Sequence, residues 1–145
     1  MAIATAFGKS GLSFWIADLL RNLDGIPLIL IILIIVTSIN LLTEVTSNMA
    51  TTAMLLPVLV TIALAIQVHP YFLLISATLA ASCAFMLPIS TPPNAVVFGS
   101  GLLKIEDMFK KGVWMNILSI IIITMVVYYI LPFVFDVSSD LIPIN

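Results

Sequence analysis

The sequence predicts an all-α integral membrane protein, and two observations carry this prediction. Of its 145 residues, 62% are hydrophobic and only 8% are charged, a balance outside that of ordinary soluble domains. The charged residues also cluster, which leaves long uncharged tracts. Each tract is about as long as the roughly 20 residues of a membrane-spanning helix, or longer. These tracts are 25–43, 45–68, 70–103 and 112–135.

The same composition excludes several classes of function. The net charge of −2 is small, and no cluster of basic residues with interleaved aromatics is present, so no nucleic-acid partner is expected. Cys83 is the only cysteine, which rules out an internal disulfide and argues against a cysteine-based metal site. The Ser and Thr residues have no His base to activate them, so the chain is not expected to be an enzyme.

Residues 1–24 are expected to form an amphipathic helix at the membrane interface. Apolar side chains such as Trp15 recur there at helical spacing, with Asp18 and Arg21 between them, a pattern typical of interfacial helices. A short connector helix is the plainer alternative. The first residues lack the pattern of a signal peptide.

The region 25–68 holds two aliphatic segments, 26–42 and 51–66, around a polar stretch. That stretch, Leu-Thr-Glu-Val-Thr-Ser-Asn-Met-Ala-Thr-Thr at 42–52, is costly beside hydrocarbon unless it lines a cavity or binds something. The two segments could form a re-entrant hairpin or two ordinary spans joined by an outside loop. Hydropathy alone favours ordinary spans, because re-entrant segments are the rarer solution.

The region 69–103 is predicted to be a transmembrane helix that is broken at 88–94. Pro70 suits the first turn of a helix, and the following residues 71–86 are rich in Ala and Ser, which permit close helix packing. Three prolines at 88, 92 and 93 then end the helix. Thr91 is a candidate N-cap with Pro92 at the first position of a second helix that reaches Gly101.

The remainder is predicted to be a basic loop, a final span and a tail. Residues 104–112 carry three of the five basic residues, so the positive-inside tendency makes this loop cytoplasmic. Residues 113–135 are predicted to span the bilayer. Residues 136–145 form an acidic tail on the outer side.

The two polar breaks predict a site for an anion bound together with a cation. Ser47 and Asn48 would begin one helical segment and Thr91 another, and helix N-termini attract anions. Neither break contains Lys, Arg or His. The nearby oxygens could instead hold a hard cation, which prefers such ligands. We therefore expect a sodium ion, with oxygens from Thr43, Thr46, Ser47, Asn48 and Ser90.

Three polar residues within or beside the spans allow more than one role. Glu44, the only carboxylate in the polar stretch, could be a proton or cation ligand, or a hydrogen-bonding strut at the tip. Asn40 and Asn116 are more typical of interhelical hydrogen bonds than of ligands.

At the two breaks the sequence resembles the divalent anion/sodium symporter family, transporters of dicarboxylates, citrate or sulfate. Thr-Glu-Val-Thr-Ser-Asn at 43–48 resembles the second of the family's paired Ser-Asn-Thr motifs, and 82–101 resembles its signature containing Pro-Pro-Asn-Ala. The resemblance implies that 25–68 is a re-entrant hairpin with its tip at 43–50, which reverses the preference from hydropathy. It also implies that 69–103 is a discontinuous transmembrane helix.

The resemblance further implies the roles of individual residues. Ser47, Asn48, Thr91 and Pro92 would contact a substrate carboxylate. A sodium site would come from Thr43, the Thr46 carbonyl, Asn48 and Ser90. Met49 stands where the family motif has Thr, which removes a hydroxyl donor and adds bulk.

Members of the family are longer and consist of two inverted halves. The resemblance therefore implies the C-terminal part of an elevator-type sodium-coupled symporter for dicarboxylates or tricarboxylates, or for a related divalent anion, in the cytoplasmic membrane. Such a part would need an N-terminal half to transport, and the whole would be a homodimer. The alternatives are a non-transporting membrane subunit or remnant, and a transporter of another anion such as arsenite.

Overall fold

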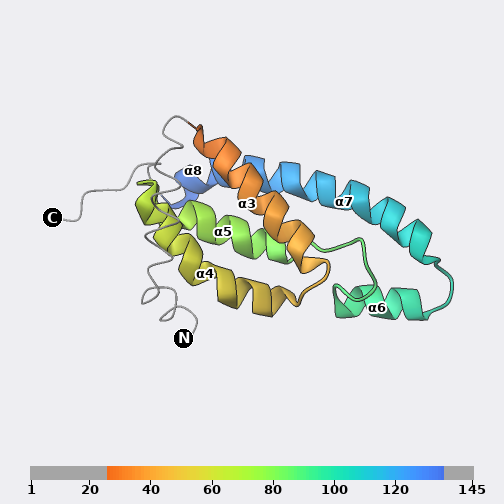
Figure 1. Ribbon diagram of the computed structural model, residues 1–145. Coiled ribbons are helices and arrows are strands. Elements are labelled where there is room, and N and C mark those ends of the chain that lie inside the picture. The colour runs from red at the N-terminus through yellow and green to blue at the C-terminus, as the bar shows by residue number, and fades with distance from the viewer. Residues whose placement is uncertain (1–25, 136–145) are drawn as a thin grey trace.

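The computed structural model describes residues 26–135, which form helices and loops without a strand (Figure 1). The expected interfacial helix 1–24 and the tail 136–145 lie outside these residues. Two helices, Asn48–Ala65 and Ile105–Phe135, are long and apolar enough to cross a membrane. In chain order the elements are α3 (Leu28–Thr43), α4 (Asn48–Ala65), α5 (Pro70–Ala81), α6 (Pro92–Gly99), α7 (Ile105–Met125), the π-helical turn η1 (Val126–Ile130) and α8 (Leu131–Phe135).

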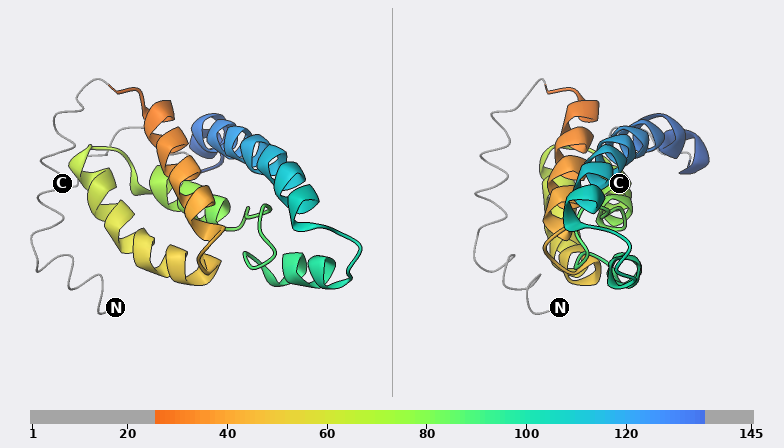
Figure 2. Two further views of the ribbon diagram at one scale, coloured as in Figure 1. Left: turned by 45° about the vertical axis from the view of Figure 1, so that its right-hand side comes forward. Right: turned by 90° about the vertical axis from the view of Figure 1, so that its right-hand side faces the viewer.

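Helices α3 and α4 form an antiparallel pair around the polar tip 44–47. The aliphatic run ends at Thr43, and the N–H groups of Glu44 and Val45 bond to carbonyls three residues earlier, which tightens the last turn. Ser47 is extended and precedes α4. Helix α4 continues through Pro57 to Ala65. The start of α3 and the end of α4 therefore lie at the same end of the molecule (Figures 1 and 2).

Helix α5 is the centre of the bundle and packs against α3, α4 and α7. Small side chains allow this close approach, since Ser76, Ala77, Ala80 and Ala81 are all buried. The prediction that these small residues permit close helix packing is confirmed. The core around it consists of Ile32, Val36, Ile39, Leu59, Ala63, Phe72, Leu73, Ala77, Ala80, Ala81, Ile123, Val127 and Leu131.

The break between α5 and α6 is longer than the prolines predicted. Helix α5 ends at Ala81, although the sequence favoured helix as far as Met86. The N–H groups of residues 85–87 donate to the side chain of Glu44, just after α3, and do not continue the hydrogen bonds of the helix. The N-cap prediction is confirmed, because Thr91 accepts a hydrogen bond from the Asn94 N–H and Pro92 begins α6, which ends at Gly99.

Helix α7 begins at Ile105, so residues 105–112, which were expected to be a loop, are its first turns. Glu106 and Asp107 lie in the first turn, where negative charge stabilises the positive end of the helix dipole. Helical structure then continues through η1 and α8 to Phe135. The segment predicted as 113–135 is thus part of a 31-residue helix that runs back along the molecule (Figure 1).

Candidate functional site

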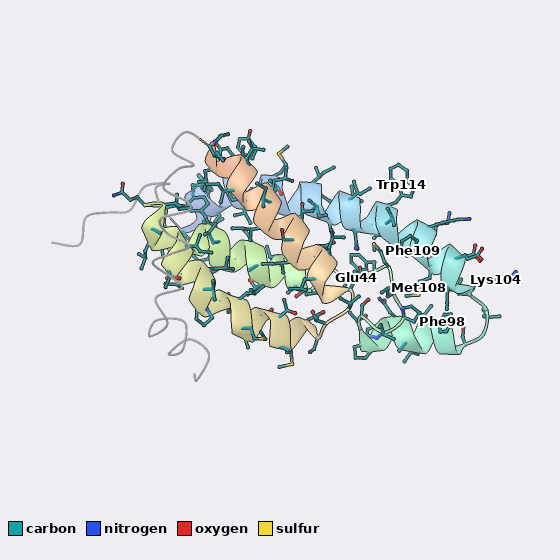
Figure 3. All side chains as sticks on the ribbon, viewed as in Figure 1. Glu44, Phe98, Lys104, Met108, Phe109 and Trp114 are labelled. Atoms are coloured by element: carbon teal, nitrogen blue, oxygen red, sulfur yellow. The ribbon has the colours of Figure 1, made fainter. Side chains whose placement is uncertain are left out.

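The carboxylate of Glu44 joins the hairpin tip to the break. Glu44 is only 2% exposed and lies where α3 meets the loop beyond α5 (Figure 3). Its Oε1 accepts hydrogen bonds from the N–H groups of Phe85 at 2.8 Å and Met86 at 3.0 Å. Its Oε2 accepts from Met86 N–H at 3.1 Å, Leu87 N–H at 3.1 Å and the Ser90 hydroxyl at 2.6 Å. Of the two roles open to Glu44, the structure therefore supports the hydrogen-bonding strut.

Amide side chains bind the carbonyl groups of the same break. Asn40 of α3 donates to the Cys83 carbonyl. Asn94 of α6 donates to the carbonyls of Ala84 at 3.0 Å and Leu87 at 3.1 Å. A helix that is interrupted away from water needs partners for both kinds of freed backbone group. Here one carboxylate serves the donors and two amides serve the acceptors.

Helix α7 contacts the same point from a third side. The Asn116 side chain donates to Glu44 Oε1 at 2.7 Å. One turn earlier, a Cβ added to Gly112 would collide with the backbone of Phe85 and Met86, so α7 and the break pack backbone against backbone. Asn40 and Asn116 were predicted to make interhelical hydrogen bonds. Both do make hydrogen bonds to another part of the bundle, but their partners, Cys83 and Glu44, lie just beyond the ends of α5 and α3.

The N-termini of α4 and α6 lie close together, and the two helices run apart in opposite directions (Figures 1 and 2). Helix α4 begins at Asn48 and α6 at Pro92. The contact between Glu44 and Ser90 joins the chain only a few residues before each of these starts. Two positive helix ends therefore face a common region, which is a favourable arrangement for an anion.

The four residues expected to bind substrate lie at these two helix ends. Ser47 precedes α4, and its hydroxyl makes no capping hydrogen bond. Asn48 is half-buried at the first position of α4, while Pro92 is exposed at the first position of α6. The Thr91 hydroxyl accepts from the Asn94 N–H at 3.4 Å. Within residues 26–135 no hydrogen bond joins Ser47 or Asn48 directly to Thr91 or Pro92.

The oxygens expected to bind sodium surround the same tip. The Thr43 hydroxyl is buried and donates to the Asn40 carbonyl at 2.9 Å. The exposed Thr46 hydroxyl donates to the Leu42 carbonyl at 2.8 Å. The Oδ1 atom of Asn48 is buried and accepts no hydrogen bond from the described part of the chain. That free oxygen is the kind of ligand that a small hard cation prefers. The Ser90 hydroxyl, another expected ligand, donates to the carboxylate of Glu44.

Two residues that organise this site were not singled out in the sequence. Asn94 lies within the Pro-Pro-Asn run, and its amide could have been expected to satisfy a carbonyl freed by the prolines. Gly112 lies in the first half of α7, where a glycine weakens a helix. Only the close approach of the break explains its presence.

Comparison with known proteins identifies the family. A sequence profile described as the sodium:sulfate symporter transmembrane region matches residues 1–135. The chain belongs to the sodium:sulfate symporter family. It is accordingly an integral protein of the plasma membrane, and its relatives are transporters rather than enzymes.

Two curated relatives are each named sodium-dependent dicarboxylate transporter SdcS. The protein from Staphylococcus saprophyticus is 45% identical over 132 residues, which is 91% of this chain and 25% of the relative. That from Staphylococcus aureus (strain MRSA252) is 47% identical over 140 residues, or 97% of this chain and 27% of the relative. The chain thus spans about a quarter of the length of the curated relatives that it matches.

Proposed function

We propose that this chain forms the C-terminal transport-domain portion of a sodium-coupled symporter for dicarboxylates such as succinate. The observation that carries the proposal is the convergence of the two helix N-termini at Asn48 and Pro92. A substrate carboxylate would accept hydrogen bonds from Ser47, Asn48 and Thr91, with Pro92 at the edge of the site. The names of the relatives favour dicarboxylate over sulfate.

The coupled sodium ion would bind on the other side of the tip. Its ligands would be the Thr43 hydroxyl, the Thr46 carbonyl, the Asn48 side-chain oxygen and Ser90. The buried, unbonded Asn48 Oδ1 supports this assignment. Asn48 would then contact both ion and substrate, so that each stabilises the binding of the other.

The proposal includes a re-entrant hairpin over 25–68 and a discontinuous transmembrane helix over 69–103. The tip contacts Asn116, which lies about a third of the way along a helix that is roughly 46 Å long at 1.5 Å per residue. The hairpin therefore extends over only part of the length of the continuous helix Ile105–Phe135, as expected for a tip at membrane depth. Residues 104–112 would be cytoplasmic. They form the end of the preceding loop and the first turns of α7.

Transport would require an N-terminal half that supplies the inverted counterpart of these elements. The assembled protein would be an elevator-type homodimer in the lipid bilayer. This chain alone is expected to bind poorly or not at all, because it holds one side of the substrate site.

Sodium-dependent binding tests the proposal. Succinate, citrate and sulfate are titrated in sodium and in potassium buffer against the chain in lipid nanodiscs, alone and co-purified with the N-terminal half of a relative. We expect saturable succinate binding that needs sodium in the paired preparation. The variant Asn48→Ala should abolish it, since it removes both the amide oxygen proposed to bind sodium and the amide N–H donor proposed to bind the carboxylate.

Thr78→Ala is the matched control. Thr78 is exposed on α5, and its hydroxyl bonds only to carbonyls of its own helix. This variant should bind succinate as the parent does. Unchanged binding in a folded Asn48→Ala variant would contradict the proposed site, and saturable binding of sulfate alone would contradict the proposed substrate class.

A further inference from the structure

We infer that Glu44 is a positioning residue that fixes the N-terminus of α6 opposite that of α4. It acts through the loop between α5 and α6 and does not touch the substrate. The inference deepens the proposed function, because the two helix ends that Glu44 aligns are the proposed anion site.

Glu44 binds its partners as a carboxylate. Every polar group that contacts its side chain is a donor: three consecutive backbone N–H groups, the Ser90 hydroxyl and the Asn116 amide. Hydrogen bonds to an ionised acceptor are roughly twice as strong as neutral ones. Inside a protein the effective dielectric constant is lower than in water, which strengthens such hydrogen bonds further. The loop is therefore bound tightly to the hairpin tip.

One oxygen of Glu44 closes the last part of this loop. Oε2 accepts from Leu87 N–H and from the Ser90 hydroxyl, so both ends of the segment 87–90 are attached to the same atom. Thr91 and Pro92 follow Ser90 directly. The first turn of α6 is therefore only two residues from an anchored point.

Among the residues described, few other contacts hold helix α6 in place. None of its residues is buried. Its first turn is instead bound by Asn94, which donates to the carbonyls of Ala84 and Leu87 within the loop that Glu44 binds. Farther along, the half-buried Phe98 and Met108 lie between α6 and the start of α7 (Figure 3). The position of the α6 N-terminus thus depends on Glu44.

The same contacts decide which donors remain for a ligand. The N–H groups of Phe85, Met86 and Leu87 are already bound to Glu44. At α6, Pro92 and Pro93 have no N–H and the Asn94 N–H donates to Thr91. An anion would therefore meet the dipole of α6 and the free backbone N–H groups in the first turn of α4. Without the Glu44 carboxylate the three donors of the loop would be released and α6 would move relative to α4. Anion binding should weaken even though no ligand-contacting residue has changed.

Distances between spin labels test the inference on the 145-residue chain in nanodiscs. With Cys83→Ala as background, the exposed pair Met49→Cys and Val96→Cys reports on α4 relative to α6. We expect one narrow distance distribution in the parent. Glu44→Gln should broaden or shift it, because an amide places N–H donors against the Met86, Leu87 or Ser90 donors. Glu106→Gln, which changes an exposed carboxylate at the start of α7, should leave it unchanged.

A second pair shows whether the bundle remains folded. Ile34→Cys on α3 and Leu64→Cys on α4 are both exposed and lie away from the break. Their distance should be the same with and without Glu44→Gln. If Glu44→Gln does not fold, Ser90→Ala decides, since it removes the contact nearest to α6. An unchanged distance between Met49→Cys and Val96→Cys in the folded variant would overturn the inference.

Succinate binding separates this inference from the proposed function. In the preparation paired with an N-terminal half, Glu44→Gln should raise the Kd for succinate by roughly tenfold or more, about 1.4 kcal/mol per tenfold, while Glu106→Gln leaves it unchanged. If neither the parent chain nor any variant binds succinate, the proposed function is wrong, but the distances between the labels still decide the role of Glu44. If the distances change and the Kd does not, Glu44 positions α6 but this position does not serve the anion site, and the link between the inference and the proposed function is wrong.

Discussion

At the scale of single residues, Asn116 shows how a polar side chain in a transmembrane helix can serve a distant loop. It is 2% exposed and donates to the carboxylate that binds the break. Asn116→Ala removes one of the donors around a buried charge and should lower the free energy of unfolding by about 1–3 kcal/mol. Thermal unfolding in nanodiscs measures this. Leu118→Ala, at an exposed position of the same helix, is the control, and equal losses in both variants would contradict the prediction.

Met49 stands where the resemblance of the sequence to the family motif predicts a Thr. Its side chain is 84% exposed at the second position of α4, so a substitution there changes the site surface with little effect on packing. Met49→Thr restores a hydroxyl donor beside the proposed anion site. One added hydrogen bond of about 0.5–1.5 kcal/mol should tighten sodium-dependent succinate binding several-fold. Met49→Val, which has the same shape without the hydroxyl, should not; an equal gain in both would assign the effect to bulk.

At the scale of elements, the packing of α7 on the break depends on one glycine. Gly112→Ala should gain up to about 1 kcal/mol in helix propensity, but the new Cβ would collide with backbone atoms of Phe85 and Met86 that cannot rotate away. Such overpacking costs about 1–3 kcal/mol, so the clash should dominate and lower stability. Gly99→Ala is the matched control, because nothing lies within 4 Å of its added Cβ. Chemical denaturation that finds both variants equally stable would rule out the close contact.

The same contact explains why two element boundaries differ from those predicted. The prolines alone allow helix as far as Met86, yet α5 ends at Ala81, and the N–H groups of Phe85, Met86 and Leu87 bond to Glu44 instead of to helix carbonyls. The start of α7 at Ile105 was not predicted, because the charges of Lys104, Lys110 and Lys111 indicated a loop. Local propensity could not have decided either boundary. The end of α5 depends on a partner that is distant in the sequence. The start of α7 is charged, and charged residues are exposed both in loops and at the ends of helices.

At the scale of the whole molecule, the lengths of the helices predict the depth of the hairpin tip. The tip meets the 31-residue helix Ile105–Phe135 at Asn116, about a third of the way along it, whereas the start of α3 and the end of α4 lie at the opposite end of the molecule from α6 (Figure 1). A nitroxide at Val45→Cys, in a Cys83→Ala background, should therefore lie within the bilayer. Labels at Gln67→Cys and Leu102→Cys should lie at opposite surfaces. Accessibility to oxygen and to a water-soluble nickel complex measures these depths, and a label at position 45 at the same surface as position 102 would indicate two ordinary spans.

The sequence by itself determined the all-helical membrane class, the helix starts at Pro70 and Pro92, and the close packing of the small residues in α5. These features follow from composition and from local backbone chemistry, such as the missing N–H of proline and the N-cap of Thr91. The motifs at 43–48 and 82–101 also indicated the family that the comparison then showed.

Only the tertiary structure decided what connects the two motifs. Glu44 could have been a ligand or a strut, and its role depends on donors that lie 41 to 72 residues further along the chain. The same is true of Gly112, whose missing side chain has meaning only beside the backbone of Phe85 and Met86. Sequence patterns report on neighbours along one helix, whereas a carboxylate that binds a loop and a second helix is defined by the way those elements meet in space.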